Sequence, residues 1–245
     1  MLRKWIRRWP WFLPCLVLTA SLAVTLLAWN TTQKAASYER QAEFDFLARE
    51  TSAHIAQRLK AYEQILRGIE GLFAASVQVT RGEFRTYVES LRVEENYPGI
   101  QALEFAQVVP AAARAAHLEA IRRDGFPGYA IRPEGRRETY TSIVYVEPFS
   151  ALNQRAFGYD MFTEPVRRQA MEQARDTGRA TLSSRVTLVQ EDPAGRVQAG
   201  FLMFIPVYQN RPGLLAPDTQ DERRARLSGW VLAPFRMENL MAGIL

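Results

Sequence analysis

One carboxylate in the middle of the chain is placed where it could bind a small polar molecule. Asp160 closes the segment FGYD (157–160) and stands between a β-rich stretch and a predicted helix. A carboxylate between a sheet and a helix can accept hydrogen bonds from N–H groups, and such bonds are strong where water is excluded. The alternative is a carboxylate that only caps a turn. The residue types alone do not decide between the two roles.

Aromatic side chains crowd the same stretch, namely Tyr140, Tyr145, Phe149, Phe157 and Tyr159. Rings of this kind can form the wall of a pocket for a flat heterocyclic ligand by stacking on it. For any single ring, an ordinary place in a β-sheet core is the more frequent role. We take Tyr140, Tyr145, Phe157 and Tyr159 as candidate ligand contacts.

The sequence has no pattern typical of catalysis or of a metal site. His54 and His117 have no Cys, His or carboxylate partner at metal-ligand spacing, and the single cysteine, Cys15, lies in an apolar run. No glycine-rich phosphate loop, GxSxG or HExxH motif occurs. We therefore expect no enzyme activity, no metal and no cofactor within these residues.

Basic residues raise the question of an anionic partner. The net charge is +5, but Arg3, Lys4, Arg7 and Arg8 supply four of the 31 basic residues, so the remaining chain is nearly neutral. This placement argues against nucleic-acid binding. Four arginine pairs could bind an anion, although such pairs usually form solvated faces, which is the expectation here. They are Arg122/Arg123, Arg136/Arg137, Arg167/Arg168 and Arg223/Arg224.

The N-terminus predicts a membrane anchor. Residues 9–29 contain no charged side chain, and about 20 such residues span the ~30 Å hydrocarbon core of a bilayer. Because the basic cluster precedes this run, residues 1–8 are expected in the cytoplasm and the bulk of the chain outside it, in the periplasm or extracellular space. A cleaved signal peptide is the alternative, but the apolar run is longer than is usual for one.

A long helix is predicted next, over residues 30–76. Ile55, Leu59, Tyr62, Leu66 and Ile69 recur at alternating steps of four and three, and Phe73 continues the pattern. This spacing is typical of a heptad seam. The seam can pack on the chain's own domain or join two copies in a dimer stalk, and both roles can hold for different parts of the helix.

Beyond the stalk the elements alternate in an α+β pattern. Thr80 and Glu83 fit a capping box that starts a helix. Strand-like runs occupy 100–109, 139–146, 181–190, 198–208 and 229–233, and helical segments occupy 111–123, 163–178 and 237–245. The hairpin signals favour antiparallel pairing over the regular alternation of a parallel sheet.

At several of these segments the chain resembles the CHASE domains, which are extracytoplasmic sensory domains of receptor histidine kinases and of nucleotide cyclases. The matching blocks are GLFAAS (71–76), FRTYV (84–88), NYPGIQALEFAQVVP (96–110), GYD (158–160), EPVRRQAMEQARDTGRATLS (164–183), LVQE (188–191) and FLMFIPVY (201–208). The resemblance implies a ligand-binding region over 77–208, with two PAS-like antiparallel-sheet lobes. The membrane-distal lobe would cover about 100–190, and the membrane-proximal lobe, over 191–240, would lead back to the membrane.

The resemblance also implies roles for three residues. The pocket aspartate of the plant cytokinin receptors in this family falls at Asp160, and their pocket leucine at Leu182. A pocket threonine of those receptors falls near Glu191, where this sequence departs from the plant pattern. The ligand is thus cytokinin-like or another small molecule.

The sequence therefore predicts the sensor domain of a transmembrane receptor, dimeric through its stalk, with a histidine kinase, diguanylate cyclase or phosphodiesterase output beyond residue 245. The expected partners are a small-molecule ligand and the inner or plasma membrane. The alternative is a single-anchor envelope protein with a structural or interaction role and no small ligand.

Overall fold

The structure is a computed structural model that describes residues 12–190, 199–209 and 216–242. It has two compact units, residues 1–55 and 56–245. The helix α1 (Phe12–Ala75) begins in the first unit and ends in the second. The expected cytoplasmic residues 1–8 lie outside the described part.

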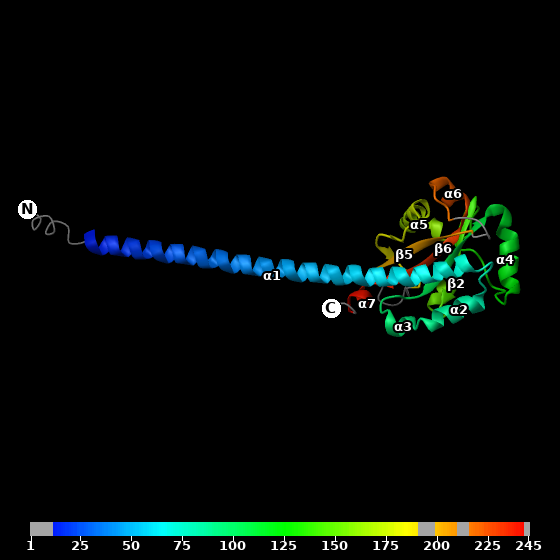
Figure 1. The fold of residues 1–245 in the computed structure, drawn as a ribbon, viewed down its shortest axis with the longest axis horizontal. Coiled ribbons are helices and arrows are strands. Elements are labelled where there is room, and N and C mark those ends of the chain that lie inside the picture. Colours follow the sequence, from blue (N-terminus) through cyan, green and yellow to red (C-terminus); the bar gives the residue numbers. More distant parts are fainter. Residues whose placement is uncertain (1–11, 191–198, 210–215, 243–245) are drawn as a thin grey trace, which may run out of the picture. The chain divides into compact units, whose positions relative to one another are not determined.

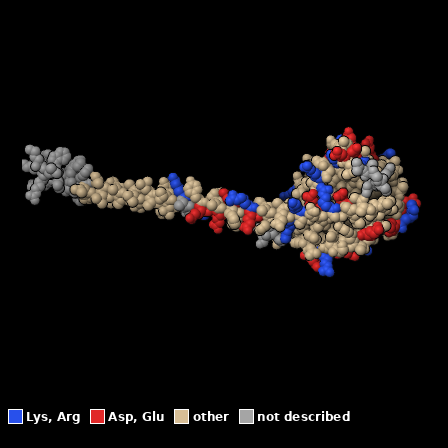
Figure 2. Space-filling view, viewed as in Figure 1, with Lys and Arg blue, Asp and Glu red and all other residues tan. Residues whose placement is uncertain are grey.

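In the first unit, α1 begins as an apolar and exposed helix. Its large apolar side chains from Leu13 to Trp29 are between 53% and 69% exposed. No acidic or basic residue occurs in the described part before Lys34, as Figure 2 shows. The helix is long and apolar enough to cross a membrane, as expected for residues 9–29.

In the second unit, the seam of α1 packs on the chain's own domain. Tyr62, Leu66 and Ile69 are at most 2% exposed, and Leu59 and Phe73 pack against the same core. Packing on the domain is therefore the role of this part of the seam. Upstream, Phe44, Phe46 and Leu47 remain exposed.

The described strands form one six-stranded sheet, in which neighbours pair antiparallel. The order is β2-β1-β6-β5-β3, with β4 also pairing with β5. The strands are β1 (Leu103–Pro110), β2 (Thr139–Glu147), β3 (Thr181–Leu182), β4 (Val186–Thr187), β5 (Ala199–Tyr208) and β6 (Leu227–Arg236).

This sheet corrects the expectation of two lobes. The strands β5 and β6 were assigned to a membrane-proximal lobe, but β6 pairs with β1 through Glu104–Leu232 and three further residue pairs. Both strands consequently lie in the middle of the same sheet as β1, β2 and β3, which were expected in the membrane-distal lobe. The described residues thus form one antiparallel sheet in an α+β fold.

Helices cover the sheet on two faces, as Figure 1 shows. The end of α1 and α2 (Arg81–Ser90) pack on one face, and α5 (Pro165–Thr177) packs on the other. We call these the α1 face and the α5 face. The remaining helices are α3 (Val93–Asn96), α4 (Arg114–Arg123), α6 (Gln220–Ala225) and α7 (Met237–Ala242).

The capping box predicted at Thr80 is present. The Glu83 backbone N–H donates to Thr80 Oγ1 at 3.3 Å, and the Thr80 N–H donates to the Glu83 carboxylate at 2.8 Å. We expect Thr80→Ala to lower the free energy of unfolding by about 1 kcal/mol, because backbone donors of α2 lose their acceptor. Urea denaturation measures this. Ser90→Ala is the control, since this exposed hydroxyl of α2 only donates to the Tyr87 carbonyl within the helix; equal losses would contradict the prediction.

Candidate functional site

The α5 helix is fixed tightly to its face of the sheet. It begins at Pro165, and Glu164 caps it by accepting from two backbone N–H groups. The helix predicted over 163–178 thus starts two residues later than expected, with Glu164 as its cap. The buried Trp230 of β6 donates its Nε1–H to the Met171 carbonyl of α5 at 3.0 Å. Side chains between α5 and the sheet therefore have defined positions.

Asp160 lies on the α5 face and is fully buried. Its Oδ1 accepts from the Thr141 backbone N–H and the Thr141 hydroxyl, both at 2.9 Å, and from the Phe162 N–H at 3.4 Å. It thereby caps a short 3-10 helix, Met161–Thr163. The other oxygen, Oδ2, has no hydrogen-bond partner in the described residues and faces Arg137 Nε at 3.5 Å.

A cavity of about 480 Å³ lies beside Asp160. Thr141, Phe162 and Arg137, the three residues that contact the Asp160 side-chain oxygens, all line it. The other lining residues are Val108, Glu138, Thr139, Arg168, Glu172, Arg175, Arg224, Leu227 and Trp230. Asp160 therefore positions three residues of the cavity without lining it.

Four arginines line this cavity, which we call the arginine-lined cavity. Arg137 comes from the loop before β2, Arg168 and Arg175 from α5, and Arg224 from α6. Three of them belong to the arginine pairs that were expected to form solvated faces. Arg168 and Arg224 remain exposed as expected, with 55% and 49% of their side chains accessible, although the fold brings one member of each of three pairs to the same cavity. The expectation is wrong for Arg167, which is 3% exposed.

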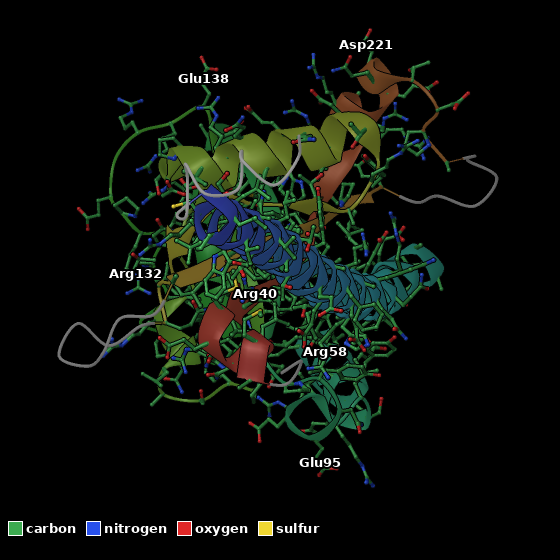
Figure 3. The ribbon with its side chains drawn as sticks, turned by 90° about the vertical axis from the view of Figure 1, so that its left-hand side faces the viewer. Arg40, Arg58, Glu95, Arg132, Glu138 and Asp221 are labelled. Atoms are coloured by element: carbon green, nitrogen blue, oxygen red, sulfur yellow. The ribbon has the colours of Figure 1, made fainter. Side chains whose placement is uncertain are left out.

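Each arginine of the cavity has a carboxylate partner, which for Arg137 is Asp160. Arg175 and Arg224 share Asp176, each with a contact of 2.6 Å, and they hold the pKa of Asp176 well below its usual value. Arg168 pairs with Glu172 at 3.0 Å. Glu138 at the rim extends outward from the domain, as Figure 3 shows. The lining itself has four arginines and two glutamates, and Asp160 and Asp176 add two carboxylates in contact with these arginines.

A second cluster of polar side chains on the α5 face is fully buried. Glu104 of β1 is 1% exposed and Arg167 of α5 is 3% exposed. Gln190 donates to Glu104 Oε1 at 2.5 Å, while Arg167 donates to the Tyr159 hydroxyl at 2.9 Å and to the Thr187 carbonyl at 2.7 Å. Burial raises the pKa of Glu104 to about 8, against the opposing effects of the Arg167 charge and the Gln190 bond.

The four candidate aromatic residues do not share one wall. Tyr159 binds Arg167 on the α5 face. Tyr145 lies in the core of the α1 face, where its hydroxyl donates to the Val79 carbonyl at 2.8 Å. Tyr140 belongs to a third cluster of buried residues, and Phe157 packs against that cluster. The Tyr140 hydroxyl donates to the Gly135 carbonyl.

Leu182 is not brought to Asp160. Leu182 pairs with Met203, which belongs to the core of the α1 face. Directly opposed residues of an antiparallel pair share a face, so Leu182 lies on the face opposite to Asp160. Glu191 lies outside the described residues.

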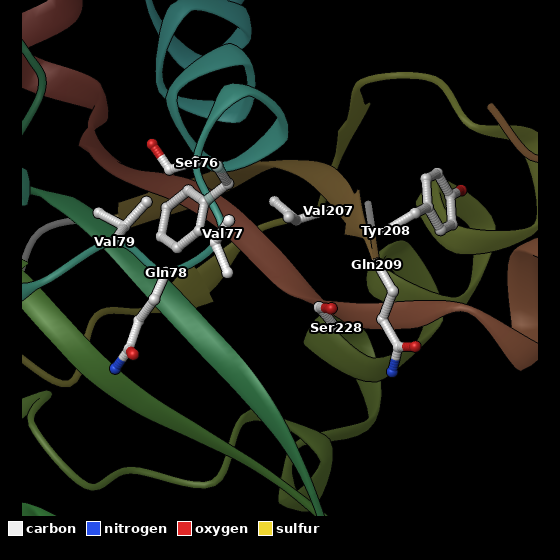
Figure 4. Close-up of a pocket in the computed structure, with 9 residues that line it drawn as sticks. Ser76, Val77, Gln78, Val79, Val207, Tyr208, Gln209 and Ser228 are labelled. Atoms are coloured by element: carbon white, nitrogen blue, oxygen red, sulfur yellow. The ribbon is translucent and has the colours of Figure 1, made fainter. Parts of the chain in front are cut away.

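A separate hollow of about 310 Å³ opens on the α1 face, where α1 ends (Figure 4). Phe73, Gln78, Val207, Gln209 and Ser228 are among its lining residues. None of its nine lining residues is charged. It therefore lacks the electrostatic character of the arginine-lined cavity. No group of three or more His, Cys, Asp or Glu in the described part could hold a metal ion.

Comparison with known proteins gives one family match. Residues 77–245 match the model of the CHASE domain. No curated protein sequence matches the chain. Among solved structures, the chain is similar to the ligand-binding domain of the Pseudomonas aeruginosa PAO1 amino acid chemoreceptor PctC in complex with GABA, at 13% identity and a TM-score of 0.47. The match covers 82% of this chain and 66% of that one, just under two thirds of its length.

Proposed function

Since this chain belongs to the CHASE domain family of extracytoplasmic sensory domains, we propose that it detects a small carboxylate in the arginine-lined cavity. The observation that carries this proposal is the convergence of four arginines on one cavity of about 480 Å³. Guanidinium groups present paired N–H donors that match a carboxylate. Cavities of this size are typical of small-molecule sites.

The uncharged walls favour an organic acid over an inorganic anion. Val108, Leu227 and the rings of Phe162 and Trp230 face the same cavity as the arginines. Apolar and aromatic surface stabilises the carbon skeleton of a ligand, which inorganic phosphate lacks. The hydroxyls of Thr139 and Thr141 add neutral hydrogen-bonding groups beside the charged ones.

The strand β6 connects this cavity to the stalk helix. Trp230 of β6 lines the cavity, and Phe235, further along β6, stacks on Tyr62 of α1 with ring centroids 5.2 Å apart. The Tyr62 hydroxyl also donates to the Pro98 carbonyl at 2.5 Å. A ligand that binds better to one position of β6 than to another would therefore shift α1.

The receptor context completes the proposal. The exposed apolar residues Tyr38, Phe44, Phe46 and Leu47 of α1 support a homodimer that forms through the stalk. The apolar start of α1 would anchor the chain in the inner or plasma membrane with the domain outside. A histidine kinase, diguanylate cyclase or phosphodiesterase would receive the signal.

We expect at least one carboxylate to bind the full chain in detergent, and its neutral amide not to bind. Suitable probes for isothermal titration calorimetry are acetate, succinate, citrate and benzoate, with acetamide, benzamide and inorganic phosphate for comparison. Arg168→Gln should weaken binding about tenfold, because it removes one charge-assisted hydrogen bond. Raising the salt concentration should weaken binding further.

Arg123→Gln is the matched control, because Arg123 and Arg168 both form exposed i,i+4 ion pairs on helices. It should bind like the unaltered chain. Equal weakening by both variants would contradict the assignment of the cavity. Absence of binding by every carboxylate would contradict the sensor proposal and favour the alternative, an envelope protein with a structural role.

A further inference from the structure

The sheet opens between two of its central strands beside the arginine-lined cavity. The pairing of β1 with β6 ends at Gln107 opposite Gly229. In an antiparallel pair the same register would next place Val108 opposite Ser228. From this point, however, β1 continues only along β2, and β6 runs only along β5. We call the opening between Val108 and Ser228 the strand split.

A second cavity, of about 550 Å³, begins at the strand split, since Val108 and Ser228 both line it. It extends over the α1 face, because several of its walls are side chains that form the core of that face or pack against it. These side chains are Phe73, Val79, Phe105, Val144 and Tyr145. Of its fourteen lining residues, Arg224 alone is charged. We call it the split cavity.

The arginine-lined cavity and the split cavity meet at three residues. Val108, Arg224 and Leu227 line both of them. Arg224 is one of the four arginines proposed to bind a carboxylate, and Val108 and Leu227 are apolar walls proposed to hold its carbon skeleton. A ligand in contact with these three residues therefore lies at the entrance to the split cavity.

We propose that the sensed molecule is a medium-chain aliphatic carboxylate whose tail passes through the strand split into the split cavity. The carboxylate would bind in the arginine-lined cavity, and the tail would lie against Phe73 near the end of α1. This inference rests on the proposed function for the position of the carboxylate, and it adds the tail and its direct contact with the stalk helix.

Other acids fit the two cavities less well. A short acid leaves the apolar walls of the split cavity in contact with water, whereas an aliphatic tail covers them. A dicarboxylate of similar length would place its second charge against uncharged walls, where it loses hydration and gains no opposite charge. A single charge at one end and an apolar chain at the other match the charged and uncharged walls in order.

Calorimetry of the full chain in detergent tests the inference with acetate, butyrate, hexanoate and octanoate. We expect affinity to rise about fourfold with each methylene group that enters the split cavity. Suberate, the dicarboxylate of the same length as octanoate, and octanamide, which lacks the charge, should both bind more weakly than octanoate. Titration of each probe into the same detergent without protein measures its partition into micelles, which is subtracted.

Ser228→Trp should remove the effect of chain length. The indole would fill the split cavity, and Ser228 does not line the arginine-lined cavity. The variant should therefore bind butyrate like the unaltered chain, and octanoate no more tightly than butyrate. Thr181→Trp is the matched control, because Thr181 is also a half-buried hydroxyl residue of a strand and lines neither cavity. It should keep the preference for octanoate.

Hydrogen–deuterium exchange gives a second readout on the unaltered chain, so a folding defect in Ser228→Trp does not prevent a decision. Saturating octanoate should slow exchange in residues 73–79, which line the split cavity where α1 ends, as well as around the arginine-lined cavity. Saturating butyrate should slow exchange around the arginine-lined cavity alone, because its chain is too short to reach Phe73.

The outcomes separate this inference from the proposed function. If acids bind but affinity does not rise beyond butyrate, the tail site is overturned and the carboxylate sensor stands. The same holds if folded Ser228→Trp keeps the preference for octanoate, or if octanoate leaves residues 73–79 unchanged. If no acid of any length binds, or if octanamide binds as tightly as octanoate, both proposals fail.

Discussion

Replacing Asp160 with alanine is expected to lower the free energy of unfolding by about 3 kcal/mol or more. The carboxylate is fully buried and accepts from the Thr141 N–H, the Thr141 hydroxyl and the Phe162 N–H. Alanine leaves the Thr141 N–H and hydroxyl without their acceptor and removes the ion pair with Arg137, whereas the Phe162 N–H keeps its bond to Thr141 Oγ1. Each buried donor left without an acceptor costs about 1–3 kcal/mol. Urea denaturation of the full chain in detergent, followed by near-UV circular dichroism, measures the loss.

Asp221→Ala is the control for this prediction. Asp221 is an exposed residue in the first turn of α6, and Figure 3 shows it at the periphery of the domain. Its replacement should change the free energy of unfolding by less than about 0.5 kcal/mol. A similar small effect at both positions would show that Asp160 does not hold the cavity wall. Because the Asp160 carboxylate does not line the cavity, we expect it to make no direct contact with the ligand.

The second large effect is a loss of stability with rising pH that depends on Glu104. Burial raises the pKa of this carboxyl to about 8 from its ordinary value of 4.5. Between these values the folded chain binds more protons than the unfolded chain, so stability falls as pH rises. The full difference between the two pKa values corresponds to up to about 5 kcal/mol in the free energy of unfolding. Most of this stability is lost by the time the pH passes about 8.

His117 has the opposite effect at lower pH, and this sets the best window for measurement. Burial lowers its pKa to about 4 from 6.5, so its contribution to stability grows as pH rises through that range and is complete above it. From about pH 6.5 to 8 the His117 contribution is constant, so of these two residues only Glu104 still changes the free energy of unfolding. We expect a loss of about 2 kcal/mol in this window, measured by urea denaturation at a series of pH values.

Glu104→Gln should remove this slope, because the amide keeps the shape of the side chain and does not titrate. Glu147→Gln should keep the slope, as Glu147 is a buried carboxyl on the other face of the sheet, paired with Arg85 at 3.1 Å. If the Glu104→Gln chain lost stability between pH 6.5 and 8 as steeply as the unaltered chain, another group would be responsible.

Local sequence patterns predicted the elements well, because their causes are local. The heptad spacing from Leu59 to Phe73 and the capping box at Thr80 depend on residues within a few turns of one another. The division into two lobes failed for the opposite reason. The sheet is made continuous by the pairing of β1 with β6, as in Phe105 with Val231, and no short pattern encodes a pairing between such distant segments.

The site was harder to predict, although two signals were present. Glu104 is the one charged residue in the strand run 102–109, which is mostly apolar, so a charge there is unexpected. Arg167 lies three, four and seven residues before the buried Ala170, Met171 and Ala174, so the helical period places it on the apolar face of α5. The arginine-lined cavity gave no such signal, because Arg137, Arg168 and Arg224 meet only through the fold.

Hydrogen–deuterium exchange with and without a bound carboxylate tests the central claim most directly, because it locates the ligand on the chain. The full chain in detergent would be saturated with the tightest-binding acid of the calorimetric panel. We predict slower exchange in residues 133–141, 162–177 and 220–228, which surround the arginine-lined cavity. Slower exchange confined to the α1 face, around residues 73–79 and 207–209, or no change at all, would contradict a carboxylate sensor on the α5 face.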